Sequence, residues 1–310
     1  MAVRVGFAGC GYIAGVHMAN LKRDARAEIT CAYDPEVSRA GAIAVKDFDT
    51  LLSRVDAVYV TAPNTLHAEL ARKAVAAGKH VFCEKPMATT LDGARQALEA
   101  AQAARTVFQV GFNRRFAPVY RRVKELLQTA PAHCAHLKMN RGELLRPVWT
   151  ADEQITGGFL FETPIHMFDM MRFQFGEVGA IDARLSRAND FSMLIEFQNG
   201  LHATLVTSAD ASWFFPYERI EIFGEYATIE TEEVEALRYR IGLDAPTRTE
   251  EYRDIAHEIK MGFAEGDCLF IDAIVGKGAP PVTALDGYRA VELACAAYQS
   301  AREKRRITLT

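Results

Sequence analysis

Short hydrophobic runs alternate with helical patterns over the first hundred residues of the chain. The predicted strands are the apolar runs 3–9, 27–34, 56–63, 79–84 and 106–112. Patterns with the 3.6-residue period of a helix separate them, at 12–22, 65–78 and 89–105. Strands that alternate with helices at this spacing indicate βαβ units. The sequence therefore predicts a parallel, doubly wound α/β sheet, followed by an amphipathic helix over 116–128.

The hydrophobic pattern changes near Pro131. From Ile181 to about Tyr252 it is dominated by strand signals broken by turns, and Asn199-Gly200 is a strong hairpin signal. Helices are predicted over 162–176, 256–276 and 284–304. The second half is therefore expected to contain a mostly antiparallel sheet, preceded by the helix over 162–176. We expect domains at 1–118 and 119–310, with the last helix able to pack back on the first domain.

Composition and charge narrow the function classes. The 310 residues are 49% hydrophobic and 25% charged, which is typical of a soluble globular protein. A net charge of −4 argues against a protein that grips nucleic acid or anionic membranes. The apolar run at the N-terminus is too short and too rich in glycine for a signal peptide, and no stretch approaches the length of a spanning helix. Six cysteines without a CxxC pair fit reduced thiols, so we expect a cytoplasmic protein.

A glycine motif follows the first predicted strand and opens the first helix. Gly9 permits a tight turn, Gly11 lets the backbone approach a pyrophosphate, and the small Ala14 allows close packing of helix and strand. Asp34 follows twenty residues after Ala14, at the end of the second strand, where a carboxylate can take both hydroxyls of a ribose. The pattern favours a dinucleotide site, and the alternative is a set of turn glycines beside an Asp that starts a loop.

A charged pair ends the fourth predicted strand. Glu84 and Lys85 follow the apolar run 80–83, and Pro86 comes next. In open α/β sheets, ligands bind beyond the carboxyl ends of the strands. Because proline fixes its own φ and restricts the residue before it, Lys85 would be aimed at that crevice. The alternative is a surface lysine at a strand end, followed by a proline that starts a helix.

A second group of polar residues lies in the helix predicted over 162–176. Glu162, His166 and Asp169 are spaced i, i+4, i+7 and would share one helical face. An imidazole beside carboxylates can exchange a proton near neutral pH. The alternatives are a metal site or a polar stripe with a satisfied buried histidine. His133 and His136 are predicted on a strand, facing opposite ways, so we expect no metal.

Four further residues have open interpretations. His67 follows a strand end, so it could line a cofactor crevice or pack at a helix start. His17 is expected to pack near the glycine loop. Cys10 and Cys83 lie near the proposed site, but nothing in the sequence shows a partner that would activate either thiol.

The ordered set of motifs resembles the glucose–fructose oxidoreductase / inositol dehydrogenase / rhizopine-catabolism family (Gfo/Idh/MocA). The resemblance covers nearly the whole chain and rests on the segments GFAGCGYIAGVH, YDPEVSRA, TAPNTLHAELARKAVAAGKHVFCEKPMA, VGFNRRFAP, GGFLFETPIHMFDMMR and PPVTALDGYRAVELACAAYQSA. It implies an N-terminal Rossmann domain, then an α/β domain with a large, open, mostly antiparallel sheet that commonly forms dimer or tetramer contacts. It implies a nicotinamide cofactor as well, and the carboxylate of Asp34 favours NAD over NADP. It also implies a sugar, cyclitol or related polyol as substrate.

The resemblance also implies roles for single residues. Lys85 matches the lysine that touches the reacting oxygen, and His166 matches the general base. Glu162 stands where inositol dehydrogenase-like members usually have Asp, so its carboxylate is displaced by about one methylene. Asp169 matches an acid that orients the histidine or relays its protons. The expected cofactor contacts are Gly9, Gly11, Tyr12, Ile13, Ala14, Asp34, Arg39, Thr61, Pro63, Asn64, His67, Glu84 and Lys85. The expected substrate contacts are Lys85, Asn113, Arg114, Trp149, Glu162 and His166.

These features favour a dehydrogenase that moves a hydride between the nicotinamide and a secondary alcohol or ketone of a sugar or cyclitol. Two alternatives remain: a redox-neutral glycoside hydrolase that uses NAD, and a non-catalytic sensor that binds a dinucleotide. Lys85 and His166 argue against the sensor. The expected partners are a small polyol substrate and further copies of the chain, as a homodimer or homotetramer, with no nucleic acid and no membrane.

Overall fold

The computed structural model describes residues 2–140, 148–187, 189–211 and 216–309, without the side chains of Val148 and Trp149. The chain divides into two compact units. The first unit combines Met1–Asn113, Gln154–Gly157 and Phe263–Val291. The second unit combines Arg114–Glu153, Gly158–Gly262 and Glu292–Thr310. Each unit is therefore assembled from three separate stretches of the chain.

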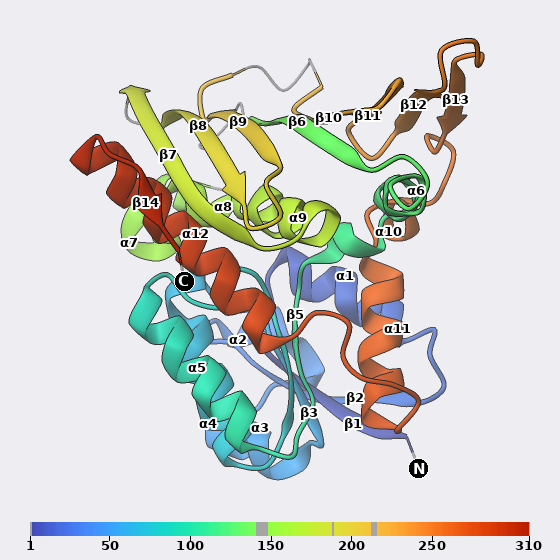
Figure 1. Ribbon diagram of the computed structural model, residues 1–310. Helices are drawn as coiled ribbons and strands as arrows, with labels where there is room; N and C mark the ends of the chain where they lie inside the picture. The colour runs from blue at the N-terminus through green and yellow to red at the C-terminus, as the bar shows by residue number, and fades with distance from the viewer. Residues whose placement is uncertain (1, 141–147, 188, 212–215, 310) are drawn as a thin grey trace. The chain divides into compact units, whose positions relative to one another are not determined.

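The first unit is built on a five-stranded parallel sheet with the order β2-β1-β3-β4-β5 (Figure 1). Its strands are β1 (Val3–Ala8), β2 (Ala27–Tyr33), β3 (Ala57–Val60), β4 (His80–Cys83) and β5 (Phe108–Val110). An isolated parallel bridge pairs Ala44 with Ala32 of β2, at the edge of β2 that does not pair with β1. If the bridge counts as a strand, the order becomes 3-2-1-4-5-6, which is that of a doubly wound dinucleotide-binding fold. The predicted doubly wound sheet is confirmed.

Helices cover both faces of the parallel sheet, with α4 and α5 on one face and α1 and α11 on the other (Figure 1). The helices of this unit are α1 (Tyr12–Leu21), α2 (Val37–Ala40), α3 (Phe48–Arg54), α4 (His67–Ala76), α5 (Leu91–Ala103), α11 (Phe263–Ile274) and the first part of α12 (Ala284–Glu303). Short helices η1 (Gly41–Ile43), η2 (Asn64–Leu66) and α7 (Glu153–Thr156) complete it, and η3 (Asn113–Phe116) follows β5 at the boundary with the second unit.

An aromatic ladder forms the core between the sheet and helices α1 and α11. The strand register pairs Phe7 with Tyr59 and Tyr59 with Phe82, so the three rings lie on one face of the sheet. Their centroids are 4.9 and 4.6 Å apart in stacked geometry, and Phe270 of α11 meets Tyr59 edge-on at 5.5 Å. Such pairs contribute about 0.5–1.5 kcal/mol each beyond the area they bury. The late segment that contains α11 is therefore part of the core of the first unit.

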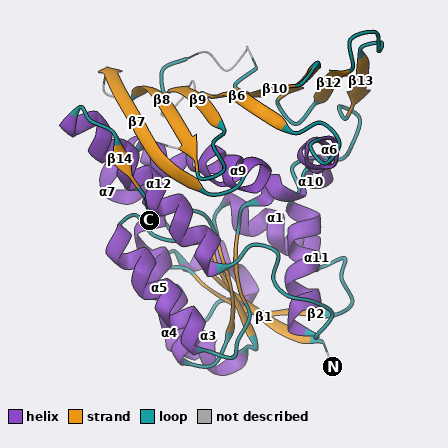
Figure 2. Ribbon diagram, in the orientation of Figure 1, coloured by secondary structure: helices purple, strands orange, loops and turns teal. Residues whose placement is uncertain are grey.

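The second unit contains a nine-stranded sheet with the order β13-β12-β11-β10-β6-β9-β8-β7-β14 (Figure 2). Its strands are β6 (Ala132–Met139), β7 (Val178–Arg187), β8 (Asp190–Phe197), β9 (His202–Ser208), β10 (Glu218–Gly224), β11 (Ala227–Glu232), β12 (Ala236–Ile241), β13 (Arg248–Glu251) and β14 (Ile307–Thr308). Every neighbouring pair is antiparallel except β6 and β9. The predicted hairpin joins β8 to β9, and Gly200 has a φ of +89° at its turn.

One face of this second sheet is covered by helices. Alternate residues of β8 are buried, and Phe197 packs edge-on against Phe175 of α9 at 5.7 Å, while Phe191 packs against Tyr298 of α12 at 5.5 Å. The helices of this unit are α6 (Pro118–Leu126), α8 (Phe159–Glu162), α9 (Ile165–Phe175), α10 (His257–Lys260), the end of α12 and the 3-10 helix η4 (Val148–Ala151). The alternation of buried and exposed residues along β8 thus separates a covered face of the sheet from an exposed one.

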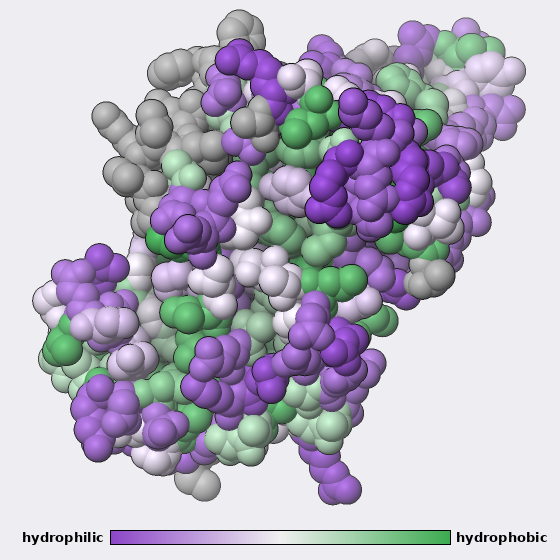
Figure 3. Space-filling model, turned by 90° about the vertical axis from the view of Figure 1, so that its left-hand side faces the viewer, coloured by the Kyte–Doolittle hydropathy of each residue, from purple (hydrophilic) through white to green (hydrophobic). Residues whose placement is uncertain are grey.

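The molecular surface mixes hydrophilic and hydrophobic residues, as the face drawn in Figure 3 shows. In the described ranges, no helix combines the length and the hydropathy that are needed to cross a membrane.

Two neighbouring glycines of the first loop should respond very differently to substitution. Gly9 has a φ of +96°, and a Cβ added there would lie 2.5 Å from the backbone nitrogen of Ala62. Left-handed backbone costs a non-glycine residue about 1–2 kcal/mol, and the clash adds to it. We expect Gly9→Ala to lower the thermal midpoint by several degrees. Gly11 has extended backbone with nothing within 4 Å of an added Cβ, so Gly11→Ser should change it little. Equal midpoints of the two variants in calorimetry would contradict this account.

Candidate active site

The glycine turn and Asp34 lie together at the carboxyl edge of the parallel sheet. Gly9 follows β1, and Gly11 is the N-cap of α1, whose residue Ala14 is buried. Asp34 follows β2, and its two carboxylate oxygens accept hydrogen bonds from the backbone N–H groups of Cys10 (2.8 Å) and Glu36 (2.9 Å). A carboxylate has about four lone-pair sites, so Asp34 can hold the loop and still accept further hydrogen bonds.

The loop after β3 closes the other side of this turn. The Thr61 hydroxyl donates to the backbone oxygen of Gly9 at 2.7 Å, and a Cβ on Gly9 would collide with Ala62. The strand order reverses between β1 and β3, and ligands bind at such a switch point in open α/β sheets. Two other predicted cofactor residues lie in this loop: Pro63 is the N-cap of η2, and the buried Asn64 donates from Nδ2 to the backbone oxygen of Thr156 at 3.2 Å. On α1, Tyr12 is exposed and Ile13 is partly buried. Arg39 is exposed and pairs with Glu36 at 2.7 Å.

His67 connects two loops rather than facing solvent. Its ring is buried, with Nδ1 2.7 Å from the backbone oxygen of Pro86 and Nε2 2.7 Å from that of Ala62. Burial lowers the pKa of His67, and a neutral ring donates to one of these carbonyl groups at a time. The side chain therefore ties the loop after β3 to the turn that follows Lys85.

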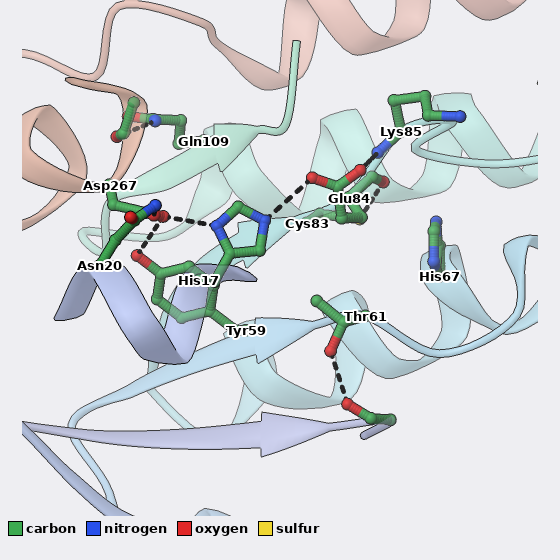
Figure 4. Close-up of polar contacts among 12 residues, drawn as sticks. His17, Asn20, Tyr59, Thr61, His67, Cys83, Glu84, Lys85, Gln109 and Asp267 are labelled. Atoms are coloured by element: carbon green, nitrogen blue, oxygen red, sulfur yellow. Dashed lines mark hydrogen bonds and ion pairs between the residues drawn. The ribbon is translucent and has the colours of Figure 1, made fainter. Parts of the chain in front are cut away.

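The residues after β4 point in two directions, as Figure 4 shows. Glu84 is buried and turned toward His17, whose Nε2 lies 3.2 Å from Glu84 Oε1. The other oxygen of Glu84 accepts the backbone N–H of Lys85 at 3.2 Å. The Lys85 ammonium extends away from His17, and the Lys85–Pro86 peptide bond is cis. The Glu84 carboxylate thus points toward the buried His17, whereas the Lys85 side chain points away from it.

The two cysteines near this edge are not activated thiols. Burial, with a smaller contribution from Asp34, raises the pKa of Cys10 to about 11. Burial likewise raises the pKa of Cys83 well above its usual value, with Glu84 adding to the effect. Because the thiolate is the nucleophile, these raised pKa values keep both thiols mostly protonated near neutral pH.

Glu162, His166 and Asp169 are all buried in the second unit, but they do not share one uninterrupted helix. Glu162 is the last residue of α8, and a turn at residues 163–164 precedes α9. Pro164 has no backbone N–H to continue the helical ladder, so a new helix begins after it. The predicted single helix over 162–176 is therefore wrong. His166 and Asp169 remain neighbours on α9, three residues apart.

Two buried ion pairs, which sequence reasoning missed, hold the start of the second unit. Arg115 donates two hydrogen bonds to Asp169, at 2.8 and 2.6 Å. Arg114 donates to the fully buried Glu218 at 2.7 Å, and the Tyr120 hydroxyl donates to the same carboxylate. The motif that contains both arginines is visible in the sequence, but their acidic partners lie 54 and 104 residues away.

The remaining predicted substrate contacts are placed as follows. Asn113 is buried at the start of η3. Trp149 lies in η4, and its side chain is outside the described part of the structure. Lys85 belongs to the first unit, whereas Glu162 and His166 belong to the second. In the described residues, no three His, Cys, Asp or Glu side chains form a group that could hold a metal ion.

The strand order, the glycine turn and the carboxylate after β2 define the class of dinucleotide-binding Rossmann proteins. Residues 3–112 match the model "Oxidoreductase family, NAD-binding Rossmann fold", and residues 132–309 match "Oxidoreductase family, C-terminal alpha/beta domain". The chain belongs to this oxidoreductase family, Gfo/Idh/MocA, and is an NAD-binding oxidoreductase.

Full-length relatives support this assignment. The chain is 28% identical over 334 residues to inositol 2-dehydrogenase of Rhizobium meliloti (strain 1021), covering 100% of both chains. It is 27% identical to myo-inositol 2-dehydrogenase of Thermotoga maritima, covering 99% of this chain and 98% of the relative. The solved structure of levoglucosan dehydrogenase in complex with NADH and L-sorbose has the same fold, with a TM-score of 0.90, 22% identity and coverage of 100% of both chains.

Proposed function

We propose that the protein transfers a hydride between NAD and a secondary alcohol or ketone of a sugar, a cyclitol or a derivative of one. The observation that carries the proposal is the shared sheet edge, at which the glycine turn, Asp34 and Lys85 all follow parallel strands. Relatives named inositol 2-dehydrogenase, which match over their full lengths, support a polyol as substrate. Six cysteines without disulfides support a reducing compartment such as the cytoplasm.

The first unit offers a fitting cradle for a dinucleotide. The backbone at Gly11 is open at the N-terminus of the ten-residue helix α1, where N–H groups and the helix dipole favour a pyrophosphate. Asp34 would accept hydrogen bonds from the adenosine ribose. Bound NAD would supply the acceptor for the hydride. The proposed contacts remain Gly9, Gly11, Tyr12, Ile13, Ala14, Asp34, Arg39, Thr61, Pro63, Asn64, His67, Glu84 and Lys85.

The chemistry that we propose for the chain itself is proton transfer and stabilisation of charge. His166 would take the proton of the reacting hydroxyl, and the Lys85 ammonium would stabilise the oxyanion as it develops. Glu162 would accept a hydrogen bond from a neighbouring hydroxyl. Asp169 would orient His166 through the helix α9 that they share, a role supported by its bidentate anchor on Arg115. Asn113, Arg114 and Trp149 are proposed to contact the substrate.

Asp34 should make the enzyme prefer NAD over NADP. The carboxylate would face the 2′-phosphate of NADP, and like charges about 4 Å apart at an effective dielectric near 20 repel by ~4 kcal/mol before screening. A third of that value still gives roughly tenfold discrimination. Steady-state kinetics with both cofactors should show the preference, and Asp34→Ala should reduce it. Equal kcat/KM for NAD and NADP in the wild type and in Asp34→Ala would remove Asp34 from this role.

Lys85 and His166 should be essential for turnover but not for cofactor affinity. Loss of a preorganised donor to an oxyanion costs on the order of a hundred- to a thousandfold in rate, which we expect for Lys85→Ala. Loss of a general base costs on the order of a hundred- to ten-thousandfold, which we expect for His166→Ala. Glu162→Gln should mainly raise KM, with Glu162→Asp the mildest change. The readout is nicotinamide absorbance with a panel of cyclitols, hexoses and uronic acids.

A control variant and a binding measurement make this test decisive. Lys73→Ala removes an exposed lysine that pairs with Glu69 on α4, so its turnover should match the wild type. NAD dissociation constants of all variants should agree within a few-fold. The mechanism is wrong if Lys85→Ala and His166→Ala each keep more than about half of the wild-type turnover. Sugar cleavage without net reduction of NAD would instead indicate the glycoside hydrolase.

The exposed face of the nine-stranded sheet supports self-association as a homodimer or homotetramer. Leu194, Val206 and Phe223 are partly exposed at 44%, 40% and 39%. Leu194 pairs with Thr204, Thr204 with His136 and His136 with Glu221, so these four residues lie on one face of the sheet. Val206 and Phe223 follow Thr204 and Glu221 by two residues, so they lie on the same face. Apolar side chains that protrude from an open sheet are stabilised when a second copy covers them.

A charge placed on this face should dissociate the oligomer. We expect the wild type to sediment as a dimer or larger species at micromolar concentration, and Val206→Glu to shift it toward monomer. Leu243→Glu changes a residue that is 64% exposed outside the strands, so it should leave the oligomer unchanged. A monomeric wild type in sedimentation velocity, with or without NAD, would refute this proposal.

A further inference from the structure

A chain of buried charged side chains joins helix α11 to the backbone of Lys85 (Figure 4). Asp267 Oδ1 lies 2.7 Å from His17 Nδ1, and His17 Nε2 lies 3.2 Å from Glu84 Oε1. The second oxygen of Glu84 accepts the Lys85 N–H at 3.2 Å. All three side chains are buried, with exposures of 2%, 1% and 5% for Asp267, His17 and Glu84. The path from Asp267 to Lys85 is therefore continuous and excludes solvent.

Neighbouring side chains hold the contact between Asp267 and His17 in place. Asn20 donates to Asp267 Oδ2 at 2.8 Å, and the Tyr59 hydroxyl donates to Asp267 Oδ1 at 3.1 Å. The rings of Tyr59 and Phe82 lie 5.3 and 4.9 Å from the imidazole of His17. Asp267 is thus fixed by two donors, and the imidazole can move little between its two carboxylate partners.

The contact between Glu84 and His17 depends on the absence of a side chain at Gly111. A Cβ added to Gly111 would lie 2.3 Å from Glu84 Oε1. Gly111 also donates its backbone N–H to Cys83 at 2.8 Å, so it cannot retreat without disturbing the sheet. The glycine therefore leaves the space in which the Glu84 carboxylate meets His17.

The imidazole bridges two carboxylates, which requires two N–H donors. A neutral ring has one donor, and its other nitrogen would place a lone pair against an acidic oxygen, whereas the imidazolium donates to both. Burial by itself lowers the pKa of His17, but Asp267 and Glu84 outweigh it and raise the pKa to about 10. His17 is therefore a buried cation at neutral pH that offsets the charges of its partners.

We propose that His17 is a positioning residue that transmits the placement of helix α11 to Lys85. The Asp267–His17–Glu84 chain fixes the backbone at residues 84–85, and so fixes the point from which the lysine side chain extends. The chemical consequence rests on the proposed function, in which Lys85 stabilises an oxyanion. His17 and Asp267 are 250 residues apart, so this site is incomplete without the late segment of the chain.

The test compares His17→Gln and Asp267→Asn with Asp272→Asn. The control residue lies on the same helix, but it pairs with the partly exposed Arg26 and with Lys277 rather than with His17. Hydrogen exchange, measured by mass spectrometry on overlapping peptides that span residues 83–90, reports on the Lys85 amide. We expect at least tenfold faster exchange there in His17→Gln and Asp267→Asn, with Asp272→Asn like the wild type.

Kinetics supply the second readout. His17→Gln and Asp267→Asn should lower kcat at least tenfold while the NAD dissociation constant changes less than threefold. A purely structural role predicts instead uniformly faster exchange, or unchanged kcat with a lower thermal midpoint, and either result overturns the proposal. Should His17→Gln not fold, Gly111→Ala displaces the Glu84 carboxylate and should give the same local loss of protection.

The charge on His17 is tested by pH. Because its folded pKa is raised above the unfolded value near 6.5, the stability it contributes is fully present below about pH 6.5 and lost toward pH 10. The difference in thermal midpoint between the wild type and His17→Gln should therefore shrink over that range. Asp267, Glu84 and Tyr59 face the ring and are present in both proteins. A difference independent of pH overturns the cationic bridge.

The exchange and pH measurements need no substrate, so this inference can fail separately from the proposed function. A wild type that is inactive on every polyol would remove the role of Lys85 in oxyanion stabilisation. A wild type that is active and depends on Lys85, with His17→Gln unchanged in kcat and in protection, would remove the role of His17 alone.

Discussion

Both units of this structure depend on the pairing of buried charges. An unpaired ion in the interior costs several kcal/mol, so each buried carboxylate or cation needs a partner at short range. In the first unit, His17 lies between Asp267 and Glu84. In the second unit, Arg115 neutralises Asp169 at 2.6 Å. These pairs join segments that are far apart in the sequence. Glu84 also accepts the backbone N–H of Lys85, and Asp169 lies on the same helix, α9, as His166.

The doubly wound sheet explains why so many polar residues meet at one edge. Parallel strands all end on the same side, so the turns after β1, β2, β3 and β4 bring Gly9, Asp34, Thr61 and Lys85 to that side. The close approach of Gly9 to Ala62 is possible because no Cβ intervenes. The turns at the switch point therefore approach each other through their backbones, and backbone N–H groups are the natural partners of a phosphate.

Two residues expected to touch the cofactor use their polar atoms within the protein. His67 links the carbonyl groups of Ala62 and Pro86, and the Glu84 carboxylate receives His17 and the Lys85 N–H. Both therefore support the shape of the loops that carry the proposed contacts. A motif that binds a cofactor needs such supporting residues as much as it needs contacts, because a loop with unsatisfied buried polar groups is unstable.

The sequence by itself determined the elements and much of the proposed chemistry, because both have short-range signatures. Strand and helix periods, the hairpin at Asn199-Gly200 and the spacing from Ala14 to Asp34 all lie within local windows. Pro164 is a local signal for a helix break, but the helical periodicity on both sides of it favoured one continuous helix. Only the tertiary structure decided that Asp267 belongs beside His17, and that Arg114 pairs with Glu218. Partners 250 and 104 residues apart leave no periodic trace, because a salt bridge requires only complementary charges that folding brings together.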